Sequence, residues 1–155
     1  MTRKPITPEG YRKLLARLDH LKRVEMPKIV QAIEEAREHG DISENAEFHA
    51  AKEQQGIIQA QIHDIQARLS NLNIVDVDQL SMDHVTFGST VVLEDLDNGQ
   101  KVTYQLVGED EADPGAGKIS IISPVALALK GKKIGEEIQV RTPKGIREFE
   151  VLDIR

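Results

Sequence analysis

The sequence predicts an α+β fold in which a long helical hairpin precedes a small β-sheet domain. Apolar residues recur at steps of three and four in the first half of the 155-residue chain and alternate with polar residues over short runs in the second half. The second half also holds a strong β-hairpin turn, Asp97-Asn98-Gly99. We place the boundary near residues 74–83, so that residues 1–76 form the first domain and residues 77–155 the second.

The first helix is predicted to begin after Thr7, because threonine followed by Pro8 is a typical N-cap and first turn. It is predicted to end at Gly40, since glycine readily terminates a helix. Between these residues, apolar side chains recur with helical spacing at Tyr11, Leu14, Leu18, Leu21, Met26, Ile29, Ile33 and Ala36. This stripe is typical of one face of an amphipathic helix.

The register of the first stripe slips by one residue between Leu21 and Met26. Pro27 follows directly, and a proline inside a helix removes one backbone hydrogen bond. Sharp changes of helix direction usually have an identifiable cause of this kind. We therefore expect the first helix to bend at Pro27.

A second apolar stripe follows the short break around Gly40. Its steps alternate strictly between three and four over more than three heptads, through Phe48, Ala51, Gln55, Ile58, Ile62, Ile65, Leu69 and Leu72. This spacing is typical of a coiled-coil seam. Two long helices joined by a short turn must lie antiparallel. About 30 residues in each helix give a rod on the order of 45 Å long.

Short apolar runs in the second half predict strands at residues 90–93, 102–106, 118–122, 138–140 and 149–151. Residues 142–145 (Thr-Pro-Lys-Gly) form a second, weaker turn signal. One short helix is predicted after Ser123, because this cap residue is followed by Pro124, an apolar stretch and a terminal Gly131. The expected result is a small, mostly antiparallel sheet that carries one helix.

Composition excludes several classes of function. Acidic residues outnumber basic ones by 26 to 20, and the resulting net charge of −6 disfavours binding of duplex phosphates through a basic face. The absence of cysteine excludes disulfides and thiolate chemistry and fits a reducing cytoplasm. No apolar run reaches the roughly 18 residues of a membrane helix, and residues 1–5 precede no apolar stretch typical of a secretory signal. We expect an acidic cytoplasmic protein without membrane contact.

The charges of the predicted hairpin are polarised. Residues 1–23 carry seven bases against two acids, whereas residues 34–47, around the turn, carry six acids against one base, Arg37. Crowding like charges at an exposed turn costs free energy, which a cation or a positively charged partner offsets. For Glu34 and Glu35, a solvated acidic face is an equally good explanation.

Asp41 and Glu44 are the acidic pair with the clearest chemistry. Three residues apart at a helix start, their β-carbons lie about 5–6 Å from each other, so both carboxylates can converge on one divalent cation. Mg²⁺ favours one or two protein carboxylates together with water and phosphate oxygens. The same spacing fits a capping box, in which the two side chains satisfy backbone amides at the helix start. Spacing alone does not decide between these roles.

Residues 35–53 (EAREHGDISENAEFHAAKE) closely resemble the coiled-coil tip of the bacterial Gre transcript-cleavage factors. Residues 7–14 are similar to the T-x-x-G-x-x-K-L pattern of the family's N-terminal region. Residues 108–113 (GEDEAD) and 123–132 (SPVALALKGK) resemble patterns of its C-terminal domain. The match runs in order through essentially the whole chain. One departure is Phe48, where the family commonly has tyrosine.

The resemblance implies an N-terminal antiparallel coiled coil and an FKBP-like C-terminal domain. It also implies that the chain binds bacterial RNA polymerase that has backtracked, leaving the nascent RNA 3′ end in the secondary channel. The coiled coil of such factors enters this channel, where Asp41 and Glu44 would help to hold the second Mg²⁺ and position the attacking water. The chain is then not an enzyme on its own and holds no cofactor stably when free. We expect a monomer.

Arg37 and Lys52 lie within a few turns of the bend on opposite helices. The resemblance implies that they form a small basic patch that contacts the extruded RNA. A purely local role is open for each. Arg37 has acids at pairing distance in Glu34 and Asp41. Lys52 has no acid three or four residues away, so its local role is that of a solvated side chain.

Ser123 and Pro124 also have two possible roles. As the cap and first turn of the predicted short helix, they have a plain structural function. The resemblance implies in addition that their loop belongs to the surface that docks on the polymerase at the rim of the secondary channel.

Two rival functions are open. A Gre-like factor can occupy the channel and inhibit the polymerase without stimulating cleavage, although the intact pair of Asp41 and Glu44 argues against this. Alternatively, the C-terminal domain is a prolyl isomerase carried by a coiled-coil dimeriser. That activity needs an apolar, aromatic-lined pocket, and the second half offers only Phe87, Tyr104 and Phe149.

Overall fold

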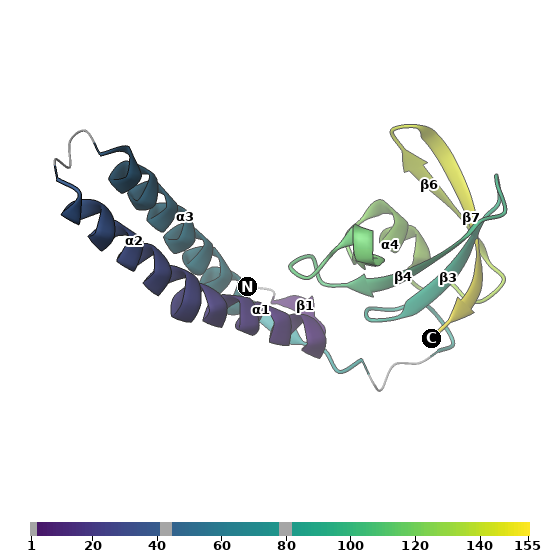
Figure 1. The fold of residues 1–155 in the computed structure, drawn as a ribbon. Coiled ribbons are helices and arrows are strands. Elements are labelled where there is room, and N and C mark those ends of the chain that lie inside the picture. Colours follow the sequence, from purple (N-terminus) through teal and green to yellow (C-terminus); the bar gives the residue numbers. More distant parts are fainter. Residues whose placement is uncertain (1–2, 41–44, 78–81) are drawn as a thin grey trace. The chain divides into compact units, whose positions relative to one another are not determined.

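The computed structural model describes residues 3–40, 45–77 and 82–155, which are drawn in Figure 1. Contacts divide the chain into two units. We call Arg12–Asn71 the hairpin unit, and Met1–Tyr11 together with Leu72–Arg155 the sheet unit. The first eleven residues thus group with the C-terminal part of the chain, a division that differs from the boundary drawn after residue 76 from the sequence.

The first arm of the hairpin is helical throughout. It comprises α1 (Pro8–His20), a π-helical turn (Leu21–Glu25) and α2 (Met26–Glu38). The second arm is α3 (Ala46–Leu69), which packs beside α2 in the opposite direction (Figure 1). The predicted pair of long antiparallel helices is confirmed.

The π-helical turn accounts for the slip in the first apolar stripe. Here the Met26 amide donates to the Leu21 carbonyl, five residues back instead of four, so the turn takes up one extra residue. Leu21 is fully buried, and the stripe resumes beyond the turn in α2. Pro27 follows in the first turn of α2, a position that tolerates proline. The π-helical turn therefore explains the slip in register, whereas a bend at Pro27 stays a prediction.

Two apolar clusters join the arms of the hairpin unit. The cluster farther from the bend is formed by Leu21, Ile58, Ile62 and Ile65. The cluster nearer the bend, which we call the tip cluster, is formed by Ile33, Ala36, Phe48 and Ala51. These residues confirm the predicted seam, except that Leu72 is buried in strand β2 (Leu72–Ile74) and not in the helix.

The sheet unit is built on five strands in the order β5-β4-β3-β7-β6. They are β3 (Thr90–Asp95), β4 (Lys101–Val107), β5 (Lys118–Ser120), β6 (Glu137–Thr142) and β7 (Gly145–Ile154). Neighbouring strands are antiparallel except β4 and β5, which are parallel. The predicted strands are confirmed, although residues 121 and 122 form a turn.

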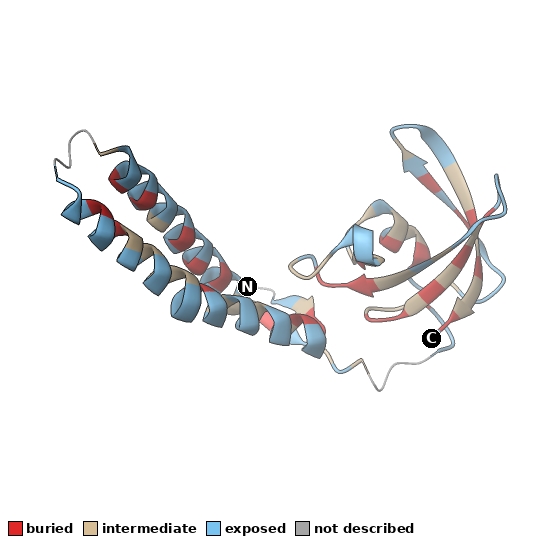
Figure 2. Cartoon of the chain, viewed as in Figure 1, coloured by how far each residue is buried: buried red, intermediate tan, exposed pale blue. Residues whose placement is uncertain are grey.

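The core of the sheet unit combines side chains from the sheet with those of α4 (Pro124–Leu129). Along β6, buried Ile138 and Val140 alternate with exposed neighbours, a pattern visible in Figure 2. From α4, Ala126 and Leu129 are fully buried in the same cluster. The expected small sheet with one short helix is therefore confirmed.

The sheet unit also contains a parallel strand pair that the sequence does not predict. Strand β1 (Lys4–Ile6) pairs with β2, and Pro5 lies opposite Asn73. The Val75 amide extends this pairing by donating to the Ile6 carbonyl at 2.9 Å. Because Ile6 is fully buried, packing holds this strand as well as hydrogen bonds.

Asp95, the last residue of β3, is a buried acid in the sheet unit. It is only 3% exposed, and its carboxylate accepts hydrogen bonds from Arg147 Nη2 and, at 2.9 Å, from the Asp97 amide. The hydrogen bond from Arg147, supported by that of Asp97, holds the pKa of Asp95 below its ordinary value. The Arg147 guanidinium also lies 5.9 Å from the centroid of the Phe149 ring, so it is held from two sides.

Candidate functional site

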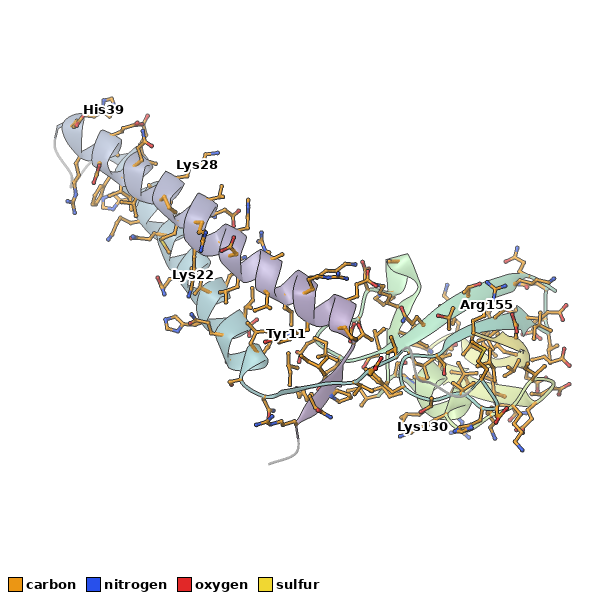
Figure 3. All side chains as sticks on the ribbon, turned by 90° about the horizontal axis from the view of Figure 1, so that it is seen from below. Tyr11, Lys22, Lys28, His39, Lys130 and Arg155 are labelled. Atoms are coloured by element: carbon orange, nitrogen blue, oxygen red, sulfur yellow. The ribbon has the colours of Figure 1, made fainter. Side chains whose placement is uncertain are left out.

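The candidate site lies at the bend of the hairpin, where α2 ends and α3 begins. The His39 amide donates to the Ala36 carbonyl at 3.3 Å, and the Gly40 amide donates to the Arg37 carbonyl at 3.5 Å. Gly40 has a φ of +115°, which favours glycine. Gly40 therefore ends the first arm as predicted. His39 marks this end of the hairpin in Figure 3.

Asn45 organises the start of α3. Its side-chain oxygen accepts a hydrogen bond from the Phe48 amide at 3.1 Å, which makes Asn45 the N-cap of the helix. Its side-chain nitrogen donates to the Ala36 carbonyl of α2. One side chain thus links the last turn of the first arm to the first turn of the second.

Asp41 and Glu44, the predicted metal-binding pair, lie outside the described residues. The described N-cap of α3, which begins at Ala46, is Asn45; the capping-box alternative for Asp41 and Glu44 lies outside the described residues as well. The sequence analysis missed Asn45, whose residue type and position before the second stripe could have identified it. Binding of a cation by the acidic pair stays a prediction.

The described residues beside the bend are strongly acidic. Glu34, Glu35, Glu38 and Glu47 are all exposed. Glu35 accepts a hydrogen bond from the Gln31 side chain at 3.2 Å, within the same helix. The four carboxylates repel one another at an exposed end of the hairpin, which favours a cation or a basic partner there.

Arg37 and Lys52 are both exposed and make different contacts. The Arg37 guanidinium lies 5.7 Å from the centroid of the Phe48 ring, across the two arms. In the part of the chain that the structure describes, Arg37 forms no ion pair with Glu34. Lys52 Nζ donates to Gln55 Oε1 at 3.4 Å, within α3. The structure gives each of the two bases a partner of its own.

Ser123 and Pro124 occupy the start of α4. Ser123 Oγ accepts a hydrogen bond from the Ala126 amide at 3.3 Å, and Pro124 is the first residue of the helix, so their structural role is confirmed. Ile122, which precedes Ser123, and Leu127, which lies within α4, are 59% and 61% exposed. Two large apolar side chains are thus exposed beside the start of α4, and docking at this place stays a prediction.

Two of the patterns noted in the sequence meet in the sheet unit. The Glu111 carboxylate accepts hydrogen bonds from the Thr7 amide at 2.7 Å, the Gly108 amide at 3.0 Å and the Thr7 hydroxyl. Thr7 also caps α1 by accepting from the Gly10 amide at 3.0 Å. A Cβ would lie closer than 3.0 Å to the Glu111 carboxylate at Gly10, and to the Pro5 carbonyl oxygen at Gly108. This close approach explains the two glycines.

Other kinds of site find little support in the described residues. Within residues 3–40, 45–77 and 82–155, no three His, Asp or Glu side chains gather so that they could hold a metal ion. Nor does any helix in these ranges combine the length and the hydropathy of a membrane span. The rival isomerase function needs an aromatic-lined pocket; a hollow described in the sheet unit is lined by Ala128, Lys132, Glu137, Ile138 and Gln139, none of which is aromatic.

Comparison with known proteins identifies the family. The model of the N-terminal domain of GreA/GreB transcription elongation factors matches residues 4–74, and the model of the GreA/GreB C-terminal domain matches residues 80–155. Transcription elongation factor GreA of Acinetobacter baumannii is 50% identical over 155 residues, which cover 99% of this chain and 98% of that protein. GreA of Syntrophobacter fumaroxidans is also 50% identical, with coverages of 100% and 99%.

Among solved structures, the chain is similar to the GreA factor homolog 1 (Gfh1) protein of Thermus thermophilus. It is 30% identical to this chain, covers 99% of both chains and superposes with a TM-score of 0.45. The family models together cover nearly all of the sequence, and the GreA relatives match it from end to end. The chain is therefore a member of the GreA/GreB family of transcription elongation factors.

Proposed function

We propose that this elongation factor rescues backtracked RNA polymerase by stimulating cleavage of the nascent RNA 3′ end. Membership of the GreA/GreB family supports this function. The hairpin unit enters the secondary channel of the polymerase, and its bend approaches the active site. Cleavage releases the extruded fragment and leaves a new 3′ end from which elongation resumes.

The observation that carries the proposal is the acidic end of the hairpin. The exposed glutamates beside the bend, Glu34, Glu35, Glu38 and Glu47, belong to the described helices. The sequence adds Asp41 and Glu44 in the connection between the arms. This concentration of carboxylates repels RNA phosphates unless a cation lies between them. An acidic end that acts on RNA therefore needs a metal ion beside it.

Asp41 and Glu44 suit Mg²⁺ by the chemistry of their donor atoms. Mg²⁺ takes hard oxygen ligands and is commonly held by one or two carboxylates together with water and phosphate oxygens. Two carboxylates leave most of its coordination shell to other donors, so we regard the pair as part of a site that the polymerase and the RNA complete. When bound there, the ion supplies charge that stabilises the attacking and leaving oxygens.

The chain itself positions groups at the reacting centre and does not carry out the hydrolysis. Asp41 and Glu44 present carboxylate oxygens toward the shared ion and orient the attacking water, while the polymerase carries out the hydrolysis. The free chain accordingly has no nuclease activity of its own. It also binds Mg²⁺ weakly, because two carboxylates alone make an incomplete site.

Arg37 and Lys52 contact the phosphates of the extruded RNA in this proposal. Both are exposed near the bend, and they introduce positive charge into an otherwise acidic surface. Contacts of Arg and Lys with phosphates position a nucleic acid without reading its sequence. The two bases therefore suit a factor that must act on any transcript.

Ser123 and Pro124 belong to the surface that docks on the polymerase at the channel rim. The Ser123 cap fixes the start of α4, and the exposed side chains of Ile122 and Leu127 supply apolar area beside it. Apolar side chains at the centre of a contact, surrounded by polar groups, are typical of protein interfaces. The partner is RNA polymerase, which one copy of the chain engages.

A cleavage assay on a backtracked elongation complex tests the proposal. Added wild-type chain is expected to accelerate RNA cleavage. Asp41→Asn combined with Glu44→Gln is expected to reduce that stimulation by roughly 100-fold or more, since pre-positioned charge at a reacting centre has effects of this size. Binding to the polymerase, measured separately, should stay unchanged.

Glu34→Gln combined with Glu35→Gln is the matched control. It removes the same charge from the same end of the hairpin and is expected to retain most of the stimulation. Wild-type rates from the Asp41/Glu44 double variant would contradict the assigned roles. A wild-type chain that binds and slows the polymerase without any cleavage would instead support the inhibitory alternative.

A further inference from the structure

The contact between Arg37 and Phe48 connects an exposed base to a buried ring. Phe48 is only 9% exposed and packs in the tip cluster with Ile33, Ala36 and Ala51. The Arg37 guanidinium lies 5.7 Å from the ring centroid, within the range of a cation–π contact. The ring is thus held in the core of the hairpin and also lies against the Arg37 guanidinium.

Asn45 fixes Phe48 further through the backbone. The Asn45 side chain accepts from the Phe48 amide at 3.1 Å and donates to the carbonyl of Ala36. Ala36 directly precedes Arg37 and is itself 2% exposed. The residue that carries the ring and the residue that precedes the cation are therefore tied to one side chain, so both ends of the cation–π contact are positioned before any ligand arrives.

The surroundings of Arg37 give this contact a specific use. Exposed carboxylates at Glu34, Glu38 and Glu47 lie on the same end of the hairpin and attract the guanidinium through space. A free arginine side chain among them would spread over many ion-paired conformations. An aromatic ring holds a cation without neutralising it, so the guanidinium keeps its donors for an anion such as a phosphate.

Lys52 provides the contrast within the same site. Its ammonium group donates to the Gln55 amide oxygen of its own helix at 3.4 Å, a long hydrogen bond on an exposed surface. Among the residues that the structure describes, Lys52 has no aromatic ring against its cation as Arg37 has. The two bases are therefore unequal, and Arg37 is the one whose position the fold prepares.

We propose that Phe48 is a positioning residue that acts through Arg37, holding its guanidinium ready for a phosphate of the extruded RNA. This inference rests on the proposed function, in which Arg37 contacts RNA. The RNA phosphate is the ligand, and Phe48 itself touches neither RNA nor metal. The inference assigns to Phe48 a role beyond its packing in the tip cluster.

The test is a double-mutant cycle on cleavage of a backtracked complex. The variants are Phe48→Leu, Arg37→Gln and the combination, each titrated to saturation in the full-length chain. Phe48→Leu removes the ring and keeps an apolar side chain in the tip cluster. In a chain that keeps Arg37, Phe48→Leu should lower the saturating cleavage rate about two- to five-fold. This is the factor that corresponds to the free energy of an exposed cation–π contact. In the Arg37→Gln background it should have no further effect.

Two readouts separate positioning from simple folding. Loss of folded chain raises the concentration that gives half-maximal cleavage, whereas loss of positioning lowers the rate at saturation and leaves that concentration unchanged. Phe48→Tyr is the matched control, because it keeps the ring and should retain the wild-type rate. Phe48→Met, which is also apolar and adapts its shape, replaces Phe48→Leu if circular dichroism shows that the leucine variant is unfolded.

An equal effect of Phe48→Leu in both backgrounds would overturn the inference and leave the proposed function standing. A Phe48→Leu effect confined to the half-maximal concentration would overturn it as well. A wild-type chain that fails to stimulate cleavage would remove the proposed function itself, which the first lane of the same experiment shows.

Discussion

The hairpin unit and the sheet unit achieve stability in different ways. Buried residues of the hairpin form a seam between two arms, and Leu15, Val24, Val30 and Ile57 remain substantially exposed on its outer faces. The sheet unit instead encloses a core in which Leu93, Leu106, Ala126 and Leu129 are fully buried. The helices of the hairpin can form largely from local hydrogen bonds, whereas the sheet depends on strands that are distant in sequence.

This difference shows which unit can expose many charged side chains and which provides a rigid core. A seam two helices wide leaves most side chains on the surface, where they are free to carry charge. The acidic bend can therefore be crowded with carboxylates while the tip cluster below it holds the arms together. The sheet unit encloses an apolar core, with the ion-paired Asp95 as its buried acid, and offers a firm base for the exposed side chains beside α4.

Shortening a buried side chain should give the largest difference in stability between the two units. Leu93→Ala, at a fully buried position of the sheet unit, is expected to cost about 3–5 kcal/mol of that unit's stability, because the closed core cannot collapse around the cavity. Ile62→Ala in the hairpin seam is expected to cost about 2–3 kcal/mol, at the low end of the same range, since two helices can move together. Hydrogen exchange measured peptide by peptide resolves the two units. Equal losses would show that the seam is as constrained as the core.

A glycine substitution in each unit should sharpen the contrast. Gly108→Ala would place a methyl group closer than 3.0 Å to the Pro5 carbonyl oxygen, so the backbone must shift, and we expect a loss of about 1–3 kcal/mol. Faster amide exchange in β1 and β2 is the diagnostic measurement, because Pro5 lies in β1.

Gly56→Ala in α3 is the matched control for that substitution. No atom outside its own helix lies within 4 Å of the added methyl group, and alanine favours a helix over glycine by roughly 0.5–1 kcal/mol. The hairpin unit should therefore become more stable. A loss of stability at Gly56 would mean that the outer face of α3 is not as open as described.

The smallest expected effect is a pH dependence confined to the sheet unit. The pKa of Asp95 is lowered in the folded chain by its hydrogen bond from Arg147, so the unfolded chain binds the proton more readily. The stabilisation is then complete above the ordinary pKa of about 3.9 and is lost as the pH falls through the lower folded value. Thermal unfolding followed between neutral and acidic pH measures it. Asp95→Asn should remove this acid-dependent part and leave the exchange of the hairpin amides unchanged.

Sequence periodicity predicted most of the fold because most elements are long or alternate regularly. Both arms, the five main strands and the short helix follow from apolar spacing and cap residues. Strands β1 and β2 did not, since three-residue strands have no measurable period and their partners are far apart in the sequence. The slip at Leu21 was visible, but a sequence cannot distinguish a π-helical turn from a kink when Pro27 stands beside it.

The candidate site was less accessible to sequence reasoning. The resemblance to the Gre family pointed to Arg37, yet its contact with Phe48 depends on how the two arms face each other. Asp41 and Glu44 had the spacing of a capping box as well as that of a cation site, and spacing alone does not decide between the two. Thr7 and Glu111 stood out as parts of patterns, but their hydrogen bonds join residues 104 positions apart.

The parallel pairing of β1 with β2 has a consequence for the reach of the molecule. It fastens the two ends of the hairpin to each other, with Lys4 opposite Leu72 and Ile6 opposite Ile74. Seven residues added to each arm would extend a helical hairpin by about 10 Å and leave those partners where they are. The length of the arm can thus change in evolution or by design while the strand pair at its base stays the same.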